Sequence, residues 1–335
     1  MKALISVPQG AVFDTFFPPE NIALAESLGE CVWNTETTPM TTAEVAEKIG
    51  DCDVYVTLWG SPAVDREILD NAPNLRLVTH LGGTVVPFVS DAFWASGIPI
   101  ISGNAYFAES VAEGTLAYML AGLREIPKYN AQMKEAHQWK TAEDRNAGLA
   151  GKTIGLVSYG TIARNVVRLL SMFRVQLKVY DIAPLPPEDV ERYGLQTASL
   201  EEIFSTCDII SLHTPLLEQT HHLIDRNLLQ KIKPGALFIN TSRGAIVDQA
   251  ALEDELATGR FCAVLDVFEK EPLPPESRLR ELPNTILIPH MAGPTVDLRS
   301  FITKELLLET AAYLNEGKPL VHAISQKVAS TMSKH

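Results

Sequence analysis

The stretch GLVSYGTIARNV, residues 155–166, reads as a strand, a tight turn and the start of a helix. Strand-forming residues precede the turn, and apolar residues at helical spacing, beginning with Ile162, follow it. This is the context of a dinucleotide-binding fingerprint, which usually has the pattern G-x-G-x-x-G or G-x-G-x-x-A. Here the three positions are Ser158, Gly160 and Ala163, so the first glycine is replaced and the third position is the tolerated alanine.

The turn keeps the physical basis of anion binding despite the serine. Gly160 stands where the backbone must approach a pyrophosphate, and the unpaired N–H groups and dipole of the following helix favour a phosphate. Asp181 ends the next predicted strand, where a carboxylate accepts hydrogen bonds from ribose hydroxyls and repels a 2′-phosphate. No arginine follows in IAPLPPED to hold such a phosphate, so the sequence predicts NAD rather than NADP.

Alternating strand-like and helix-like segments on both sides of this turn predict an α/β fold with parallel sheets. In the first part, strands are expected at residues 3–7, 54–58, 75–80 and 98–102, and helices at 21–28, 42–49 and 65–70. A long helix is expected at residues 109–134 as a connector. Six further strands are expected at residues 153–157, 177–181, 209–214, 237–241, 263–267 and 286–289.

Six strands match a doubly wound dinucleotide-binding sheet. After them, a helix at residues 298–315 is expected to carry the chain back to the first domain. We therefore expect two Rossmann-like domains. The substrate domain comprises residues 1–103 plus 298–335, and the NAD-binding domain comprises residues 104–297.

Composition excludes several classes of partner. The formal net charge of −13 argues against nucleic acid and anionic membranes, which are bound through basic patches. The apolar segments fall short of the roughly 20 residues that a membrane span needs, and the N-terminal apolar run is too short for a signal peptide. The cysteines show no metal-ligand spacing, so we expect reduced thiols, no bound metal and a cytoplasmic location; they are Cys31, Cys52, Cys207 and Cys262.

Three polar residues follow three neighbouring strands of the predicted second sheet. Arg243 lies in INTSRGAIVD, Glu271 in LDVFEKEPLP and His290 in IPHMAG. Because open α/β sheets bind ligands at the carboxyl ends of their strands, we expect these side chains to converge on one cleft. Together they supply the groups that hydride transfer to a 2-keto acid requires.

Each of these groups has a role that suits its chemistry. An imidazole, with an ordinary pKa of about 6.5, can donate a proton to a developing alkoxide near neutral pH, and this role falls to His290. Glu271 is expected to hold the far ring nitrogen, and the planar guanidinium of Arg243 to bind the substrate carboxylate. Taken singly, each residue also has an ordinary structural explanation: a solvated loop histidine, an arginine in a turn, and a glutamate before a proline.

Longer motifs identify a family. They are HTPLLEQTHHLI (213–224), KPGALFINTSRGAIVDQAAL (233–252), LDVFEKEPLP (265–274), IPHMAG (288–293), LWGSP (58–62) and HLGGT (80–84). Through these motifs the chain resembles the D-isomer-specific 2-hydroxyacid dehydrogenases over nearly its full length. The resemblance implies an NAD-dependent oxidoreductase that transfers a hydride between NAD(H) and a small D-2-hydroxyacid/2-keto acid pair of the glyoxylate or hydroxypyruvate kind. It also implies a flavodoxin-like first domain completed by the C-terminal helix.

The resemblance assigns residues to roles. The family's catalytic arginine, glutamate and histidine match Arg243, Glu271 and His290. The cofactor contacts that it implies fall on Ser158, Tyr159, Gly160, Thr161, Ile162, Asp181, His213, Thr214, Pro215, Thr241, Ser242, Asp266 and Gly293. Among these, Asp266 is expected to touch the nicotinamide amide. Substrate contacts are expected at Trp59 and at the backbone amides near Gly82 and Gly83.

Two positions depart from the family pattern, and two questions stay open. Ser158 replaces a family glycine, and Thr84 stands where many members have aspartate or asparagine, so no substrate preference is carried over. Dinucleotide-sensing corepressors share the fold and the three catalytic residue types, so a sensing scaffold with little turnover is the alternative function. A homodimer is expected, with the apolar face of residues 111–123 as a candidate contact and packing within the chain as the alternative.

Overall fold

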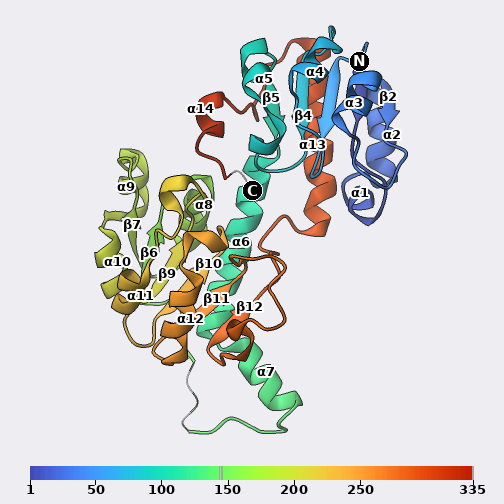
Figure 1. Ribbon diagram of the computed structural model, residues 1–335. Coiled ribbons are helices and arrows are strands. Elements are labelled where there is room, and N and C mark those ends of the chain that lie inside the picture. The colour runs from blue at the N-terminus through green and yellow to red at the C-terminus, as the bar shows by residue number, and fades with distance from the viewer. Residues whose placement is uncertain (143, 145, 334–335) are drawn as a thin grey trace. The chain divides into compact units, whose positions relative to one another are not determined.

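The computed structural model describes residues 1–142, 144 and 146–333, which fold into two compact units (Figure 1). The first unit comprises Met1–Phe107 and Pro294–His335, and the second comprises Ala108–Gly293. Each unit contains its own parallel sheet with a hydrophobic core on either face. The chain therefore leaves the first unit, builds the whole second unit, and returns.

The first sheet has five strands in the order β2-β1-β3-β4-β5, which is the flavodoxin-like order. Its strands are β1 (Lys2–Ile5), β2 (Glu30–Trp33), β3 (Val54–Thr57), β4 (Leu77–His80) and β5 (Ile100–Ser102), all parallel. Burial of both faces explains why the central strands are mostly apolar. In β3, for example, Val54 and Val56 lie in one core while Tyr55 lies in the other.

Helices cover both faces of this sheet. They are α1 (Ala11–Phe16), α2 (Pro19–Leu28), α3 (Thr42–Ile49), α4 (Arg66–Asp70), η1 (Val86–Phe88), α5 (Asp91–Ser96), α13 (Val296–Glu316) and α14 (Gln326–Ala329). Helix α13 packs along α1 and α2 (Figure 1) and is fastened to β4 by a buried 2.8 Å hydrogen bond between the hydroxyls of Thr79 and Thr310. The predicted return of the C-terminal helix to the first sheet is confirmed.

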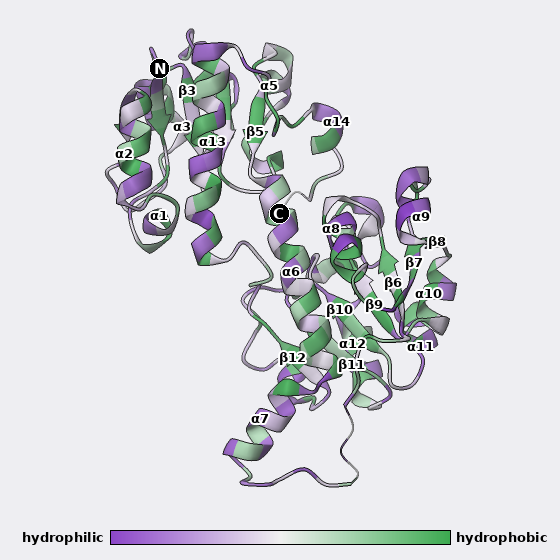
Figure 2. Ribbon diagram, turned by 180° about the vertical axis from the view of Figure 1, so that it is seen from behind, coloured by the Kyte–Doolittle hydropathy of each residue, from purple (hydrophilic) through white to green (hydrophobic). Residues whose placement is uncertain are grey.

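The second sheet has seven strands in the order β12-β11-β10-β9-β6-β7-β8. They are β6 (Thr153–Val157), β7 (Gln176–Tyr180), β8 (Gln196–Thr197), β9 (Ile209–Leu212), β10 (Leu237–Asn240), β11 (Cys262–Leu265) and β12 (Thr285–Leu287), all parallel. Figure 2 shows the central strands as hydrophobic, as expected for strands buried on both faces. The strand order reverses between β6 and β9, and such a reversal is where doubly wound sheets bind ligands.

The helices of the second unit lie on both faces of its sheet, and α6 begins in the last residues of the first unit. They are α6 (Asn104–Leu123), α7 (Ile126–Lys134), α8 (Thr161–Leu170), α9 (Pro187–Tyr193), α10 (Leu200–Thr206), η2 (Glu218–Thr220), α11 (Arg226–Lys231), η3 (Gly244–Ile246), α12 (Gln249–Ala257) and η4 (Arg278–Glu281). Close packing of α6 on the sheet depends on Gly122, where an added Cβ would lie 3.0 Å from Leu237.

The structure corrects the predicted secondary structure in three places. Strands β2 and β8 were not predicted; each is a short strand at the edge of its sheet, and neither contains a buried residue. The single helix predicted at residues 109–134 is two helices. Between them, Glu125 adopts a left-handed conformation with φ of 49°, and Pro127 lies in the first turn of α7. Proline has no N–H and clashes with the carbonyl four residues earlier, so a continuous helix is broken there.

The apolar face of α6 packs inside the second unit. Thr115 and Met119 are completely buried, and Leu116 and Leu120 pack against the same core. Thr115 and Met119 are therefore taken up by packing within the chain, whereas a subunit contact through the partly buried residues of 111–123 stays a prediction. Among the residues that the structure describes, no helix, α6 included, is long and apolar enough to cross a membrane.

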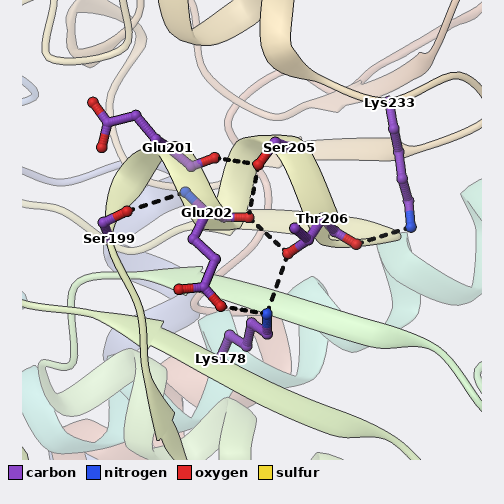
Figure 3. A network of polar contacts seen from close by, with 7 residues as sticks. All are labelled: Lys178, Ser199, Glu201, Glu202, Ser205, Thr206 and Lys233. Carbon is purple, nitrogen blue, oxygen red and sulfur yellow. Dashed lines mark hydrogen bonds and ion pairs between the residues drawn. The ribbon is translucent and has the colours of Figure 1, made fainter.

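A polar network fastens α10 to the edge of the second sheet (Figure 3). Lys178 of β7 forms an ion pair with Glu202 at 2.5 Å and donates to the hydroxyl of Thr206 at 3.3 Å. Lys233 donates to the backbone carbonyl of Thr206 at 2.9 Å, and the hydroxyl of Ser199 caps the start of the helix. These contacts hold β7, and so position the residue that follows it, Asp181.

Candidate active site

The chain turns from β6 toward α8 at Ser158, which adopts a left-handed conformation with φ of 75°. Only glycine enters this region without strain, which explains the glycine of the usual fingerprint, and a serine there costs about 1–2 kcal/mol. Its amide donates to the carbonyl of Tyr180 at 2.7 Å, and its hydroxyl lies 2.9 Å from the hydroxyl of Thr214. Ser158 thus keeps the turn and adds a side-chain hydrogen bond that glycine cannot form.

Helix α8 starts directly after this turn without a side-chain cap. Gly160 is its N-cap residue, and an added Cβ there would meet nothing within 4 Å. Thr161 and Ile162 form the first turn, and Ala163 is completely buried at the helix-packing position. An uncapped helix N-terminus beside open space is suited to a phosphate group, so this segment fits the pyrophosphate of a dinucleotide.

Asp181 follows β7 and braces the turn. Its Oδ2 accepts a hydrogen bond from the amide of Tyr159 at 2.6 Å, and its Oδ1 accepts one from the amide of Ala183 at 2.8 Å. Each carboxylate oxygen has a second acceptor site, so both remain able to accept from ribose hydroxyls. The ring of Tyr159 is buried and its hydroxyl donates to Asp189 at 3.2 Å, which leaves its backbone for cofactor contacts.

The end of β9 lies on the other side of the reversal in strand order. The amide of His213 and the hydroxyl of Thr214 both donate to the carbonyl of Val157, at 2.9 and 3.2 Å. Burial lowers the pKa of His213 to about 3, so its imidazole is neutral. The carbonyl of Pro215 accepts a 2.6 Å hydrogen bond from Thr220. These bonds tie β9 to the turn at Ser158.

The hydroxyl groups that follow β10 are used inside the protein. Thr241 lies 3.1 Å, hydroxyl to hydroxyl, from Thr115 of α6. The hydroxyl of Ser242 donates to the carbonyl of Leu212 at 2.6 Å. Both residues are buried, so they shape the strand end at which Arg243 emerges.

Arg243 lies against the loop that carries Glu271. Gly244 permits this contact, because an added Cβ would lie 1.9 Å from the carbonyl carbon of Phe268. Nη1 of Arg243 donates to the carbonyl of Ser242 at 2.7 Å. Burial lowers the pKa of the guanidinium and the negative charge of Glu271 opposes that shift. The arginine is therefore partly buried and lies within the electrostatic influence of the glutamate.

Glu271 and His290 form a direct pair. Oε2 of Glu271 lies 2.7 Å from Nδ1 of His290, and Oε1 accepts from the amide of Phe268 at 3.0 Å. His290 has a φ of 53°, and its amide donates to the carbonyl of Asp266 at 2.8 Å. With Nδ1 held by the carboxylate, Nε2 is the ring nitrogen left for a ligand. The imidazole side chain is 47% exposed, so a ligand can reach it.

Asp266 organises the segment on which His290 lies. Its two carboxylate oxygens accept from the amides of Met291 at 2.7 Å and Ala292 at 3.0 Å, and Tyr118 donates to it at 3.3 Å. Burial raises the pKa of Asp266, and the two backbone hydrogen bonds act in the opposite direction. Asp266 thus positions the His290 segment directly, whatever contact it makes with a cofactor.

The predicted substrate loops belong to the first unit and follow β3 and β4. Trp59 is 42% exposed, and its ring packs edge-on against Phe16 and Phe107, with centroids 5.6 and 6.3 Å away. An added Cβ on Gly82 would lie 2.4 Å from Nε2 of His80, so only glycine fits there. At Gly83 an added Cβ would lie 3.2 Å from Phe107.

The sequence did not single out three residues that shape these sites. Tyr118 follows Thr115 by one helical turn, so the period of α6 was the signal that it faces the strand ends. Gly244 and His80 lie within sequence motifs of the family. Their roles depend on tertiary contacts, which are those of Gly244 with the backbone of Phe268 and of His80 with the ring of Phe88. Gly293, predicted to touch the cofactor, packs tightly on α6, since an added Cβ would lie 2.7 Å from the hydroxyl of Ser110.

Comparison with known proteins agrees with this arrangement. Residues 116–292 match the family model described as D-isomer specific 2-hydroxyacid dehydrogenase, NAD binding domain. The glyoxylate reductase of Korarchaeum cryptofilum is 31% identical over 89% of this chain and 90% of its own length. The hydroxypyruvate reductase of Thermotoga maritima is 32% identical over 79% of this chain and 85% of its own.

A solved structure extends the likeness to both units. The phosphoglycerate oxidoreductase from Rhizobium etli superposes with a TM-score of 0.79 at 26% identity, over 97% of this chain and 98% of that one. Its likeness covers both sheets, and the family model covers the strand ends that carry Arg243, Glu271 and His290. The chain therefore belongs to the D-isomer specific 2-hydroxyacid dehydrogenases, an NAD-binding family of oxidoreductases.

Proposed function

We propose that the protein transfers a hydride between NAD(H) and a small D-2-hydroxyacid/2-keto acid pair, with glyoxylate and hydroxypyruvate as representative keto acids. The observation that carries the proposal is the 2.7 Å pair of Glu271 and His290, with the partly buried guanidinium of Arg243 under the electrostatic influence of the glutamate. The glyoxylate and hydroxypyruvate reductases among its relatives support this substrate class.

Three residues divide the chemistry on the substrate. Arg243 binds the substrate carboxylate with its planar fork and polarises the neighbouring carbonyl. His290 donates a proton from Nε2 to the carbonyl oxygen as negative charge develops there, and accepts it in the reverse direction. Glu271 fixes the proton on Nδ1 and stabilises the imidazolium before transfer. NADH, when bound, supplies the hydride for the keto carbon.

The cofactor residues proposed from the sequence have groups suited to a dinucleotide. The first turn of α8 offers its N–H groups to the pyrophosphate, and Asp181 accepts from the ribose hydroxyls. Asp266 is proposed to contact the nicotinamide amide in addition to holding residues 291–292. We assign the NAD-binding domain to residues 104–297. The remaining proposed contacts come from His213, Thr214, Pro215, Thr241, Ser242 and Gly293.

The substrate domain is assigned to residues 1–103 plus 298–335. Trp59 and the amides near Gly82 and Gly83 are proposed to contact the substrate. We further propose a cytoplasmic homodimer. Exposed apolar side chains at Ile126 and Trp139 support a subunit contact at α7 and the segment after it, and sedimentation of the purified protein tests it.

The decisive experiment is NADH oxidation with glyoxylate, hydroxypyruvate, pyruvate and bulkier 2-keto acids. His290→Gln is expected to lower turnover by a factor of about 10²–10⁴ while NADH affinity, measured by fluorescence, stays within about threefold. His221→Gln, at an exposed histidine of the same unit, is the matched control and should retain turnover. Undiminished turnover in His290→Gln would contradict the proposed proton donor.

The same assay separates the enzyme from a dinucleotide-sensing scaffold. The similar proteins from Korarchaeum cryptofilum, Thermotoga maritima and Rhizobium etli are two reductases and an oxidoreductase, which favours an enzyme. Negligible turnover of every keto acid, together with NADH-dependent assembly or partner binding, would favour the scaffold instead.

A further inference from the structure

Arg299 lies against the exposed tryptophan of the predicted substrate loop. It belongs to the first turn of α13, and its guanidinium carbon is 5.5 Å from the ring centroid of Trp59 and 5.7 Å from that of Phe16. Cations over aromatic faces at this range are attracted by the ring quadrupole. The arginine is thus held beside Trp59 by two rings of the same unit.

The charge of Arg299 has no partner of opposite sign among the residues that the structure describes. Among those residues, Nη1 of Arg299 donates a hydrogen bond to the hydroxyl of Thr15 at 3.3 Å. The Nε of Arg299 is buried without an acceptor. By contrast, Arg226 pairs with Asp254 at 2.8 Å. A guanidinium has five N–H donors, and a partly buried cation without an anion is destabilising. Arg299 is therefore equipped for an anion supplied from outside the chain.

A continuous row of contacts joins Arg299 to the glycine loop. Trp59 packs on Phe107, and the position of a Cβ on Gly83 would lie 3.2 Å from that phenylalanine. Gly83, Phe107, Trp59 and Arg299 thus form a series of neighbouring contacts within the first unit. A substrate held by its keto acid end near Gly83 has an aromatic wall beside its side chain and a cation at the far end.

We propose that Arg299 and Trp59 form a subsite for a second carboxylate, so that the preferred substrates are dicarboxylic 2-keto acids. This inference rests on the proposed function, because it names the substrate class of the same reaction. The guanidinium binds the distal carboxylate, which supplies the missing counter-charge, and Trp59 packs against the methylenes between the two ends. A purely structural role, in which Arg299 only supports Trp59, makes a different prediction.

The test compares substrates that differ only at the far end. The pair is 2-oxoglutarate and 2-oxopentanoate, which have the same number of carbons and the same keto acid end. The variants are Arg299→Gln, which removes the charge, and Arg299→Lys, which keeps the charge without the planar fork. Arg226→Gln, on the surface of the other unit, is the control for the loss of one arginine.

We expect the wild-type protein to prefer 2-oxoglutarate in kcat/KM. Arg299→Gln should lower kcat/KM for 2-oxoglutarate by about 30-fold, mostly through KM, and that for 2-oxopentanoate by less than about threefold. The kcat/KM of Arg299→Lys for 2-oxoglutarate should lie between those of the wild type and Arg299→Gln. The kcat/KM of Arg226→Gln should match that of the wild type. An equal loss on both substrates would overturn the subsite and leave Arg299 as a support for Trp59.

A binding measurement decides the question independently of turnover. Calorimetry with 2-oxoglutarate in the presence of NAD⁺ should show binding to wild type that weakens by about the same factor in Arg299→Gln. Equal affinity for both proteins would overturn the subsite even if turnover is high. Failure of the wild-type protein to turn over any keto acid would count against the proposed function alone, and Arg299-dependent binding would still support the subsite.

Discussion

The two units use the carboxyl ends of their strands in opposite ways. In the second unit these ends carry charged side chains braced by backbone amides: Asp181, Asp266 and Glu271 each accept from at least one main-chain N–H. In the first unit they carry aromatic rings, closely packed glycines and a neutral, fully buried histidine. We propose that this difference separates two tasks, because proton transfer needs fixed charge whereas recognition needs shape.

We expect the removal of a charge from the strand ends of the second unit to lower turnover more than any change in the first unit. Glu271→Gln keeps the size of the side chain but removes the carboxylate that holds Nδ1 of His290 at 2.7 Å, so kcat should fall by about 10²-fold with little change in NADH affinity. Steady-state kinetics and NADH fluorescence measure the two quantities. Glu269→Gln, two residues earlier in the loop, removes only a surface contact with His222 and should stay within about threefold. Equal losses of kcat in Glu271→Gln and Glu269→Gln would show that Glu271 has no special role in turnover.

A steric change in the first unit should act on stability and KM instead. Gly82→Ala places a methyl group 2.4 Å from Nε2 of His80, whose ring is held by Thr57 and Phe88. The displaced loop should cost about 1–3 kcal/mol of unfolding free energy and raise the keto acid KM. Gly83→Ala meets only the edge of Phe107 and should cost less, as urea unfolding of both variants will show. A larger effect at Gly83 would contradict the packing argument.

In the part of the chain that the structure describes, each unit has a fully buried, neutral histidine, and these should weaken the fold in acid. Burial lowers the pKa of both His80 and His213 to about 3. In the unfolded chain each histidine takes up a proton near pH 6.5. Above that pH, neither histidine makes the free energy of unfolding depend on pH. As pH falls from 6.5 toward 3, each should remove about 1.4 kcal/mol of stability per pH unit.

Substitution isolates this contribution. Between pH 7 and pH 5, both the wild type and His80→Gln should lose unfolding free energy. The loss in His80→Gln should be smaller than that in the wild type by about 2 kcal/mol. His221→Gln, at an exposed histidine, should show the wild-type dependence. Parallel curves for wild type and His80→Gln would show that the buried imidazole takes up a proton without unfolding.

The smallest effect is expected at the serine of the dinucleotide turn. Ser158→Gly relieves backbone strain of about 1–2 kcal/mol but loses the hydrogen bond to Thr214, which contributes about 1 kcal/mol. The unfolding free energy and the NADH dissociation constant should therefore change little. Thr214→Val removes this bond and also the one that Thr214 donates to the carbonyl of Val157, and it keeps the strain, so it should be the less stable variant in urea unfolding. A large gain in NADH affinity in Ser158→Gly would show that the serine limits cofactor binding.

Periodicity and motif order were enough to predict both sheets and the return of the C-terminal helix. Central strands such as β3 and β10 are buried at every residue and are mostly apolar in sequence, whereas the edge strands β2 and β8 contain no buried residue. The break at Glu125 was missed because one left-handed residue leaves the apolar pattern of α6 nearly intact on its N-terminal side.

The candidate site was predictable where function depends on residue type at a strand end. Glu271 and His290 were expected to meet, and they do so at 2.7 Å. Contacts that depend on distant segments were not predictable. The approach of Gly244 to Phe268 and the position of Arg299 over Trp59 join residues far apart in the sequence, and no spacing rule links them.

Helix α13 also has a consequence for how the protein is made. The second unit is one uninterrupted segment and needs no residue beyond Gly293, whereas the first unit cannot be completed without residues 294–335. At 5–20 residues per second, those residues take roughly 2–8 s to synthesise. Until then, the apolar surface that Ile302, Leu306 and Leu307 cover in the finished protein stays open to water and to chaperones.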